Sequence, residues 1–188
     1  MNHIATAFCL TLLFFISLTA CEAPKAEQPS APAENKELTT LILVRHAEKV
    51  ADGSEDPALT PKGEARAALL ADMLSSAEIN AIYSTPYRRN IMTVQPLADR
   101  MGMDITEYDP RQDPAVFINN LLQQHEGAKV LIAGHSNTVP HLLNALLGES
   151  RYQDLPDSAY NNLYVVSAID SARARITTLQ FEPAEQRD

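Results

Sequence analysis

The sequence predicts an α/β fold, a three-layer sandwich with a mostly parallel central sheet and helices on both faces. Two runs, 41–44 (LILV) and 130–133 (VLIA), are short, aliphatic and partly β-branched, as buried strands are. Segments of strand and helix character alternate along the chain, which is typical of a sheet covered on both sides. The sequence contains no evident internal repeat or second domain.

The first two helices are predicted from residues that favour helix ends. Thr60 can cap a helix that has Pro61 at its first position and runs to about Ser75. Pro86 opens the second helix. Gly102 ends that helix, because glycine readily adopts the left-handed conformation that follows many helices.

The other two helices are predicted in the same way. Asp113 caps a helix with Pro114 at its first position, and this helix ends near residues 125–127. The last helix covers residues 139–147 and ends at Gly148. Strands occupy the apolar segments between the helices, at 38–44, 79–83, near Ile105, 130–133, 163–167 and 174–179.

The composition fits a single soluble domain. The chain has 188 residues, of which 45% are hydrophobic and 21% are charged. Its formal net charge is -9 and its pI is about 5.0. Binding to the phosphate backbone of nucleic acids needs a basic face, so we expect no nucleic acid among the partners.

The N-terminal segment predicts export. Residues 4–20 are almost all apolar or small and include no Lys or Arg. A membrane span would need about 20 apolar residues and usually basic flanks, so a secretory signal fits better. The ending Leu-Thr-Ala-Cys at 18–21 resembles the lipobox of bacterial lipoproteins, which implies that Cys21 is lipidated after cleavage. Glu22 is not the Asp that favours inner-membrane retention in that family, so we expect a protein that faces the periplasm from the outer membrane.

These features divide the chain into parts. The only cysteines are Cys9 and Cys21, so the mature domain has no pair that could form a disulfide. Its stability must come from a core, which roughly 150 residues are long enough to bury. The expected parts are a signal peptide at 1–20, a disordered Pro/Ala/Glu-rich tether at 21–37, a folded domain at 38–182 and a tail at 183–188.

Polar residues with phosphate chemistry follow three of the predicted strands. Arg45 and His46 come directly after the first strand. Arg89 lies in the first turn of a helix that follows a strand, and His135 follows the second long aliphatic strand. Parallel strands bring their carboxyl ends to one edge of a sheet, where open α/β proteins bind ligands. An imidazole nitrogen can attack phosphorus and a guanidinium binds phosphate as a fork, so these residues indicate a phosphate site.

The motifs resemble those of the histidine phosphatase superfamily, the fold of phosphoglycerate mutase and acid phosphatase. They occur in the order and spacing of that family, and the resemblance extends over roughly residues 40–180. It implies a phosphoglycerate mutase-like fold and a phosphatase activity for the domain at 38–182. The resemblance is carried by the segments 45–48 (RHAE), 59–63 (LTPKG), 83–93 (YSTPYRRNIMT) and 130–138 (VLIAGHSNT).

The resemblance also implies a role for each motif residue. His46 matches the nucleophile, which carries a covalent phosphoryl group in the family. Arg45 and Arg89 match phosphate-binding arginines, and His135 matches a second histidine that donates a hydrogen bond to the same group. The family spacing, with a threonine four residues to either side of the arginine, selects Arg89 over Arg88. We expect Arg88 to lie at the entrance or in solvent.

The residue types themselves are compatible with these roles. A neutral imidazole, with a reference pKa of about 6.5, is a competent nucleophile near neutral pH. Two nearby guanidinium groups would favour its neutral form by repelling a positive charge. Phosphoryl transfer spreads negative charge over three oxygens, so the site needs fixed hydrogen-bond donors around them.

The general acid that protonates a leaving alkoxide has two candidates. Glu107 and Asp109 both follow the helix that carries the second arginine, and each is also compatible with a solvated loop charge. Glu48 is expected to orient its neighbours rather than to donate a proton. If no acid exists, substrates with good leaving groups are favoured, as in the phosphohistidine phosphatase branch. The short chain and the segment 134–138 (GHSNT) look closer to these compact phosphatases than to the mutases.

Two alternatives accompany this interpretation. His46, Glu48 and His135 could instead bind zinc, but two arginines in the same pocket would repel a dication, so we expect no metal and no cofactor. The alternative to a phosphatase is a lipoprotein that binds and senses a phosphorylated ligand without turnover. For the phosphatase we expect a small phosphorylated substrate, such as a sugar phosphate or a glycolipid phosphate of the cell envelope.

Overall fold

The computed structural model describes residues 36–171 and 173–184. Six strands form one sheet in the order β3-β2-β4-β1-β5-β6. Strands β1 to β4 are parallel to one another, whereas β5 and β6 are antiparallel additions at one side. The strands are β1 (Thr39–Arg45), β2 (Ala81–Ser84), β3 (Ile105–Glu107), β4 (Lys129–Gly134), β5 (Asn162–Asp170) and β6 (Arg173–Gln180).

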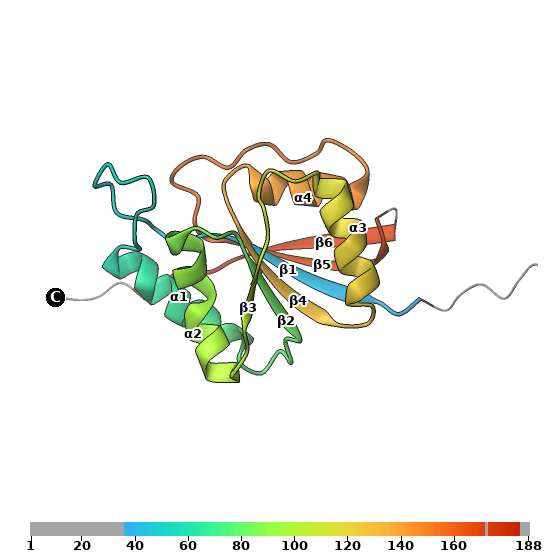
Figure 1. Ribbon diagram of the computed structural model, residues 1–188, viewed down its shortest axis with the longest axis horizontal. Helices are drawn as coiled ribbons and strands as arrows, with labels where there is room; N and C mark the ends of the chain where they lie inside the picture. Colours follow the sequence, from blue (N-terminus) through green and yellow to red (C-terminus); the bar gives the residue numbers. More distant parts are fainter. Residues whose placement is uncertain (1–35, 172, 185–188) are drawn as a thin grey trace, which may run out of the picture. The chain divides into compact units, whose positions relative to one another are not determined.

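Two helices cover each face of the sheet, as Figure 1 shows, and the predicted α/β class is therefore confirmed. Side chains alternate along β1 between the two faces. Leu41 and Leu43 pack in the core beneath α3 and α4, and Ile42 and Val44 pack beneath α1 and α2. The helices are α1 (Pro61–Leu74), α2 (Arg88–Met101), α3 (Pro114–Gln124) and α4 (Thr138–Leu147).

The predicted helix ends agree closely with the structure except at the start of α2. The Thr60 side chain accepts a hydrogen bond from the amide of Gly63, and Gly102 adopts a left-handed conformation after α2. Helix α2 begins at Arg88, two residues later than Pro86 predicted, because Tyr87 is extended with φ -90° and ψ 137°. Tyr87 provides no side-chain cap, so α2 depends on a partner from elsewhere in the chain.

That partner is Asp56, in the loop between β1 and α1. Its carboxylate oxygens accept hydrogen bonds from the amide of Arg88 at 2.9 and 3.1 Å. The positive end of the helix dipole and an unpaired amide are thus both satisfied by one remote carboxylate. This contact joins the start of α2 to the loop that follows β1.

The predicted signal peptide, Cys21, most of the tether and residues 185–188 lie outside the described residues. Within the described ranges, none of the helices has the length and apolar content of a membrane span.

Candidate active site

The carboxyl ends of β1 and β4 stop side by side. Arg45 is paired with Gly134 in the parallel register, and the amide of His46 donates to the Gly134 carbonyl at 2.9 Å. His46 and His135 therefore follow adjacent strand ends, and their ring centroids are 5.6 Å apart. A pocket of about 510 Å³ opens at this edge of the sheet. Its lining includes Arg45, His46, Arg89 and His135.

His46 is buried with one ring nitrogen already bonded. Its side chain is 3% exposed, and Nδ1 lies 2.8 Å from the carbonyl oxygen of Ala47. A carbonyl only accepts hydrogen bonds, so Nδ1 carries the proton of the neutral ring. Nε2 then holds a lone pair and has no hydrogen-bond partner among the described residues.

The surroundings keep His46 uncharged. Burial lowers the pKa of His46 to about 3, and the charges of Arg45 and Arg89 add to this effect. The hydrogen bond to Ala47 opposes the shift without overcoming it. A neutral imidazole with a free Nε2 is the form that can attack phosphorus.

Arg45 holds the segment between α4 and β5 against the pocket. Its Nη1 donates to the carbonyls of Pro156 at 2.8 Å, Ala159 at 3.2 Å and Asp157 at 3.3 Å. The guanidinium carbon lies 4.3 Å from the ring centroid of Tyr160. Its Nε is buried and without a hydrogen-bond partner in the described part of the chain, so this N–H is a polar group that the fold leaves unsatisfied.

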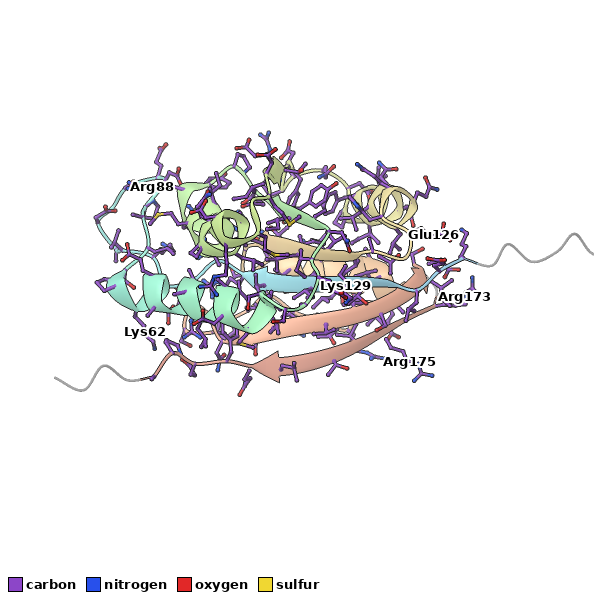
Figure 2. The ribbon with its side chains drawn as sticks, turned by 90° about the horizontal axis from the view of Figure 1, so that it is seen from below. Lys62, Arg88, Glu126, Lys129, Arg173 and Arg175 are labelled. Carbon is purple, nitrogen blue, oxygen red and sulfur yellow. The ribbon has the colours of Figure 1, made fainter. Side chains whose placement is uncertain are left out.

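The two neighbouring arginines of α2 have different environments. Arg89 lines the pocket, and its Nη1 lies 3.5 Å from Asp56. The Arg89 guanidinium lies over the Tyr87 ring, and its Nε is a second buried donor without a partner within the described residues. Arg88 is exposed, and in Figure 2 it lies at the margin of the molecule, on the same side of the view as Lys62. The structure thus places Arg89, not Arg88, in the pocket lining.

Two buried side chains of α2 fix the site segments to one another. The hydroxyl of Thr93 accepts from the amide of Ala47 at 2.9 Å and donates to the carbonyl of Arg89 at 2.7 Å. Asn90 donates from Nδ2 to the carbonyl of Gly134 at 2.8 Å. One turn of α2, which carries Arg89, is therefore bonded to the residue after His46 and to the residue before His135. Sequence reasoning used Thr93 only as a spacing mark and missed Asn90.

His135 is held neutral like His46. Burial lowers the pKa of His135 to about 4, and the charges of Arg89 and Arg45 add to this, while Asp56 opposes it. Its Nε2 lies 3.0 Å from the hydroxyl of Thr85. The ring also packs edge-on against Tyr87, with 5.0 Å between centroids.

The two acid candidates do not line the pocket that contains His46. Glu107 and Asp109 are exposed and line an adjoining pocket, which shares Tyr87 and Arg111 with the first. Arg111 binds both carboxylate oxygens of Asp109 at 3.0 Å, and these hydrogen bonds lower the pKa of Asp109. This lower pKa favours the ionised form of Asp109, whereas a general acid acts in its protonated form. The assignment of Asp109 as an acid, like that of Glu107, stays a prediction.

The carboxylates that do line the pocket of His46 are Asp154 and Asp157. Both lie in the long segment between α4 and β5, where Asp157 is 3.7 Å from Arg45 and Asp154 is 3.6 Å from His141. Sequence reasoning missed them, because this segment shows no hydrophobic periodicity and belongs to none of the recognised motifs. The dipeptide Pro156-Asp157, a common turn pair, was the one available signal.

Glu48 forms an ion pair with the buried Arg66. Arg66, which is 2% exposed, binds its two carboxylate oxygens at 2.8 and 2.9 Å. Arg66 also binds Glu182 and the carbonyl of Phe181 near the C-terminus of the domain. Burial raises the pKa of Glu48, but the hydrogen bonds from Arg66 outweigh it and hold this pKa below its usual range. Glu48 is thus an ionised anchor directly beyond the His46 segment.

Gly63, in the first turn of α1, packs closely against the main chain of Glu48. The amide of Thr60 donates to the carbonyl of Glu48 at 2.8 Å. A side chain at Gly63 would collide with that carbonyl, so α1 can approach the His46 segment only with glycine there.

In the described part of the chain, no group of three His, Cys, Asp or Glu side chains is arranged to hold a metal ion. Metal independence remains a prediction from the residue types.

A family model matches the first half of the folded domain, and one curated relative matches a segment of similar length. Residues 41–113 match the model of the histidine phosphatase superfamily, branch 1. Phosphoserine phosphatase 1 of Hydrogenobacter thermophilus is 35% identical over 78 residues, which cover 38% of this chain and 37% of that relative. The match thus spans little more than a third of the curated relative.

The fold comparison extends over more than three quarters of the chain. The protein histidine phosphatase SixA, solved with tungstate, matches with a TM-score of 0.62 and 20% identity over 77% of this chain and 97% of SixA. Phosphoserine phosphatase of Entamoeba histolytica, solved with phosphoserine, matches with a TM-score of 0.61 and 16% identity over 79% and 98% of the two chains. The two solved structures, both at most 20% identical, show a shared fold, and the family model matches residues 41–113 within it.

The Glu48–Arg66 pair generates a stability prediction. Glu48→Gln should lower the free energy of unfolding by about 3 kcal/mol, because it leaves a buried guanidinium without its main partner. The matched control is Glu182→Gln, whose carboxylate is 55% exposed and should cost less than about 1 kcal/mol. Urea denaturation measures both. Equal losses would show that Glu48 contributes no more than a surface charge.

The neutral histidines predict how stability depends on pH. The folded pKa of His46 is about 3, below the unfolded reference of about 6.5, so its contribution is complete above pH 6.5 and is lost as the pH falls toward 3. The free energy of unfolding should therefore decrease between pH 6.5 and 4. His46→Asn should reduce this slope, by up to about 1.4 kcal/mol per pH unit. A slope that is the same in both proteins would contradict a depressed pKa.

Proposed function

We propose that this chain, whose described domain has the histidine phosphatase fold, hydrolyses phosphomonoesters through a covalent phosphoryl group on His46. One observation carries the proposal. His46, whose Nε2 has no hydrogen-bond partner among the described residues, lines one pocket with Arg45 and Arg89, and each arginine has a buried Nε–H that no described residue accepts. A nucleophile beside two fixed cationic donors is what phosphoryl transfer requires.

In the first step, the lone pair of Nε2 forms a bond to phosphorus while the bond from phosphorus to the substrate oxygen breaks. Arg45 and Arg89 bind the phosphoryl oxygens, over which the charge spreads. The leaving oxygen departs with the bonding electrons and takes up a proton. In the second step, water attacks phosphorus, the bond to Nε2 breaks, and phosphate and neutral His46 are released.

We propose that the leaving group decides how fast the first step runs. Glu107 and Asp109 do not line the pocket that contains His46, and the hydrogen bonds from Arg111 favour the ionised form of Asp109. Substrates whose leaving group departs readily without a proton, such as aryl phosphates, should therefore react faster than alkyl phosphates. This agrees with the expectation of a compact phosphatase with limited acid catalysis.

The substrate is proposed to be a small phosphorylated compound. The relatives named above include phosphatases of phosphoserine and of protein phosphohistidine, so the superfamily accepts diverse leaving groups. If Cys21 anchors the chain at the envelope, a periplasmic sugar phosphate or a glycolipid phosphate fits the location. The sequence 18–21 supports this location, and it stays a proposal of its own.

A lipoprotein that senses a phosphorylated ligand without turnover is the second candidate. The observation that favours it is the exposed, solvent-side position of both acid candidates. Such a protein would bind phosphate with the same arginines but would release no product.

The arginine pair gives the first test, in which the full chain hydrolyses p-nitrophenyl phosphate. Arg89→Ala should lower kcat about 10²–10³-fold, because a fixed donor to the transferred group is lost. Arg88→Ala is the matched control, one residue away and exposed, and should remain near the unaltered protein. His46→Ala should abolish activity, and EDTA should leave the unaltered protein active.

Three outcomes would contradict the proposal. Full activity in His46→Ala would show that His46 is not the nucleophile. Equal losses in the two arginine variants would show that the choice of Arg89 over Arg88 is wrong. An unaltered protein that binds inorganic phosphate but hydrolyses nothing would favour the sensor.

The location is tested at the mature N-terminus. Mass spectrometry of the protein from its native envelope should find Cys21 as the first residue, carrying acyl chains, since lipobox cleavage occurs directly before the cysteine. Cys21→Ala should remain unacylated and unprocessed. Recovery of the unaltered protein with Met1 intact would refute the anchor and leave the phosphatase proposal standing.

A further inference from the structure

We propose that Thr85 is a positioning residue, whose hydroxyl donates to Nε2 of His135 and so fixes the His135 proton on Nδ1, the nitrogen left for a phosphoryl oxygen. The inference rests on the proposed phosphatase function, which it deepens by assigning one more residue to the site. The Thr85 hydroxyl lies 3.0 Å from Nε2 of His135, and the two residues follow the ends of different strands.

The position of Thr85 is set by the sheet. It follows Ser84, the last residue of β2, and its side chain is fully buried. The Ser84 hydroxyl donates to the Thr85 carbonyl at 2.9 Å, which helps to fix the turn into α2. Among the described residues, Nε2 of His135 is the one hydrogen-bond partner of the Thr85 hydroxyl. Because water cannot reach this hydroxyl, its single proton is directed to that nitrogen.

The proton count then decides what His135 presents to the pocket. The low pKa of about 4 keeps the ring neutral, so it carries one N–H. If Nε2 accepts from Thr85, that N–H is on Nδ1, which has no hydrogen bond within the described residues. Nδ1 can therefore donate to a phosphoryl oxygen. The opposite tautomer would direct a lone pair at that oxygen and repel it.

The arrangement complements that of His46. There the carbonyl of Ala47 can only accept, so the proton is on Nδ1 and the lone pair is on Nε2. The two rings are neutral, 5.6 Å apart and fixed by different neighbours. One presents a lone pair suited to phosphorus, and the other presents an N–H suited to oxygen. Both histidines thus carry their proton on Nδ1, fixed by a carbonyl at His46 and by a hydroxyl at His135, but they offer opposite nitrogens to a ligand, Nε2 in His46 and Nδ1 in His135.

The test compares two substitutions of one residue with a matched control. Thr85→Val keeps the shape and removes the hydroxyl, and Thr85→Ser keeps the hydroxyl. Thr39→Val is the control. Thr39 is equally buried, and its hydroxyl accepts from the amide of Gly127 and donates to the carbonyl of His125, at the opposite end of the sheet.

We expect Thr85→Val to lower kcat for p-nitrophenyl phosphate about 10- to 100-fold, because the donor is misdirected rather than removed. Thr85→Ser should restore most of the rate. Thr39→Val should leave kcat unchanged although it loses two hydrogen bonds. A Thr85→Val enzyme as active as Thr39→Val would overturn the proposal.

Nitrogen NMR of the unaltered full chain provides the second readout. With ¹⁵N-labelled histidine and saturating inorganic phosphate, His135 should show a protonated Nδ1 and an unprotonated Nε2. In Thr85→Val this preference should be lost. A protonated Nε2 in the unaltered protein would overturn the proposal.

The two proposals fail in distinguishable ways. A protein without phosphatase activity but with the Nδ1–H form of His135 would defeat the proposed function and retain the role of Thr85. If Thr85→Val does not fold, the spectrum of the unaltered protein and the activity of Thr85→Ser still decide the matter.

Discussion

The pairing of β1 with β4 is the constraint on which the site depends. The two strands are parallel neighbours in register, with Arg45 opposite Gly134, so both chains leave the sheet at the same level. The amide of His46 then bonds to the carbonyl of Gly134, which orients the first turn beyond each strand. Because the pairing consists of main-chain bonds and the strands are buried on both faces, it provides a rigid base. A slip of one residue would exchange the two faces of β1 and separate the histidines.

Helix α2 adds the third side of the site, and its connections explain why it is so firmly placed. Thr93 and Asn90 bond to the main chain beside His46 and His135, and Asp56 bonds to the first amide of the helix. These three contacts reach three different segments. Arg89 is therefore positioned by its helix, and its side chain needs no carboxylate at close range to hold it. The weak 3.5 Å pairing with Asp56 agrees with a guanidinium that remains available for a ligand.

The features that the sequence predicted well are those with local physical signals. The aliphatic runs of β1 and β4, the Thr60 and Asp113 caps and the glycine after α2 each depend on a few adjacent residues. The convergence at one sheet edge was compatible with parallel strands, and it was the resemblance of the motifs that implied it. Asp56 at the start of α2, Asn90 against Gly134 and the carboxylates of 154 and 157 were not predictable in this way. Each depends on a contact between segments far apart in the chain, for which a single sequence carries no periodicity.

The anchoring of the segment between α4 and β5 has a consequence for how such a pocket can change. Arg45 holds this segment through the carbonyls of residues 156, 157 and 159 and thus contacts atoms that every amino acid possesses. Side chains along it, including those that face the pocket, can be replaced without loss of the attachment. The part of the pocket lining that this segment supplies can therefore diversify, by evolution or by design, while Arg45 and His46 stay the same. The attachment of this segment and its contribution to the pocket lining are therefore separable, because the first uses its main chain and the second its side chains.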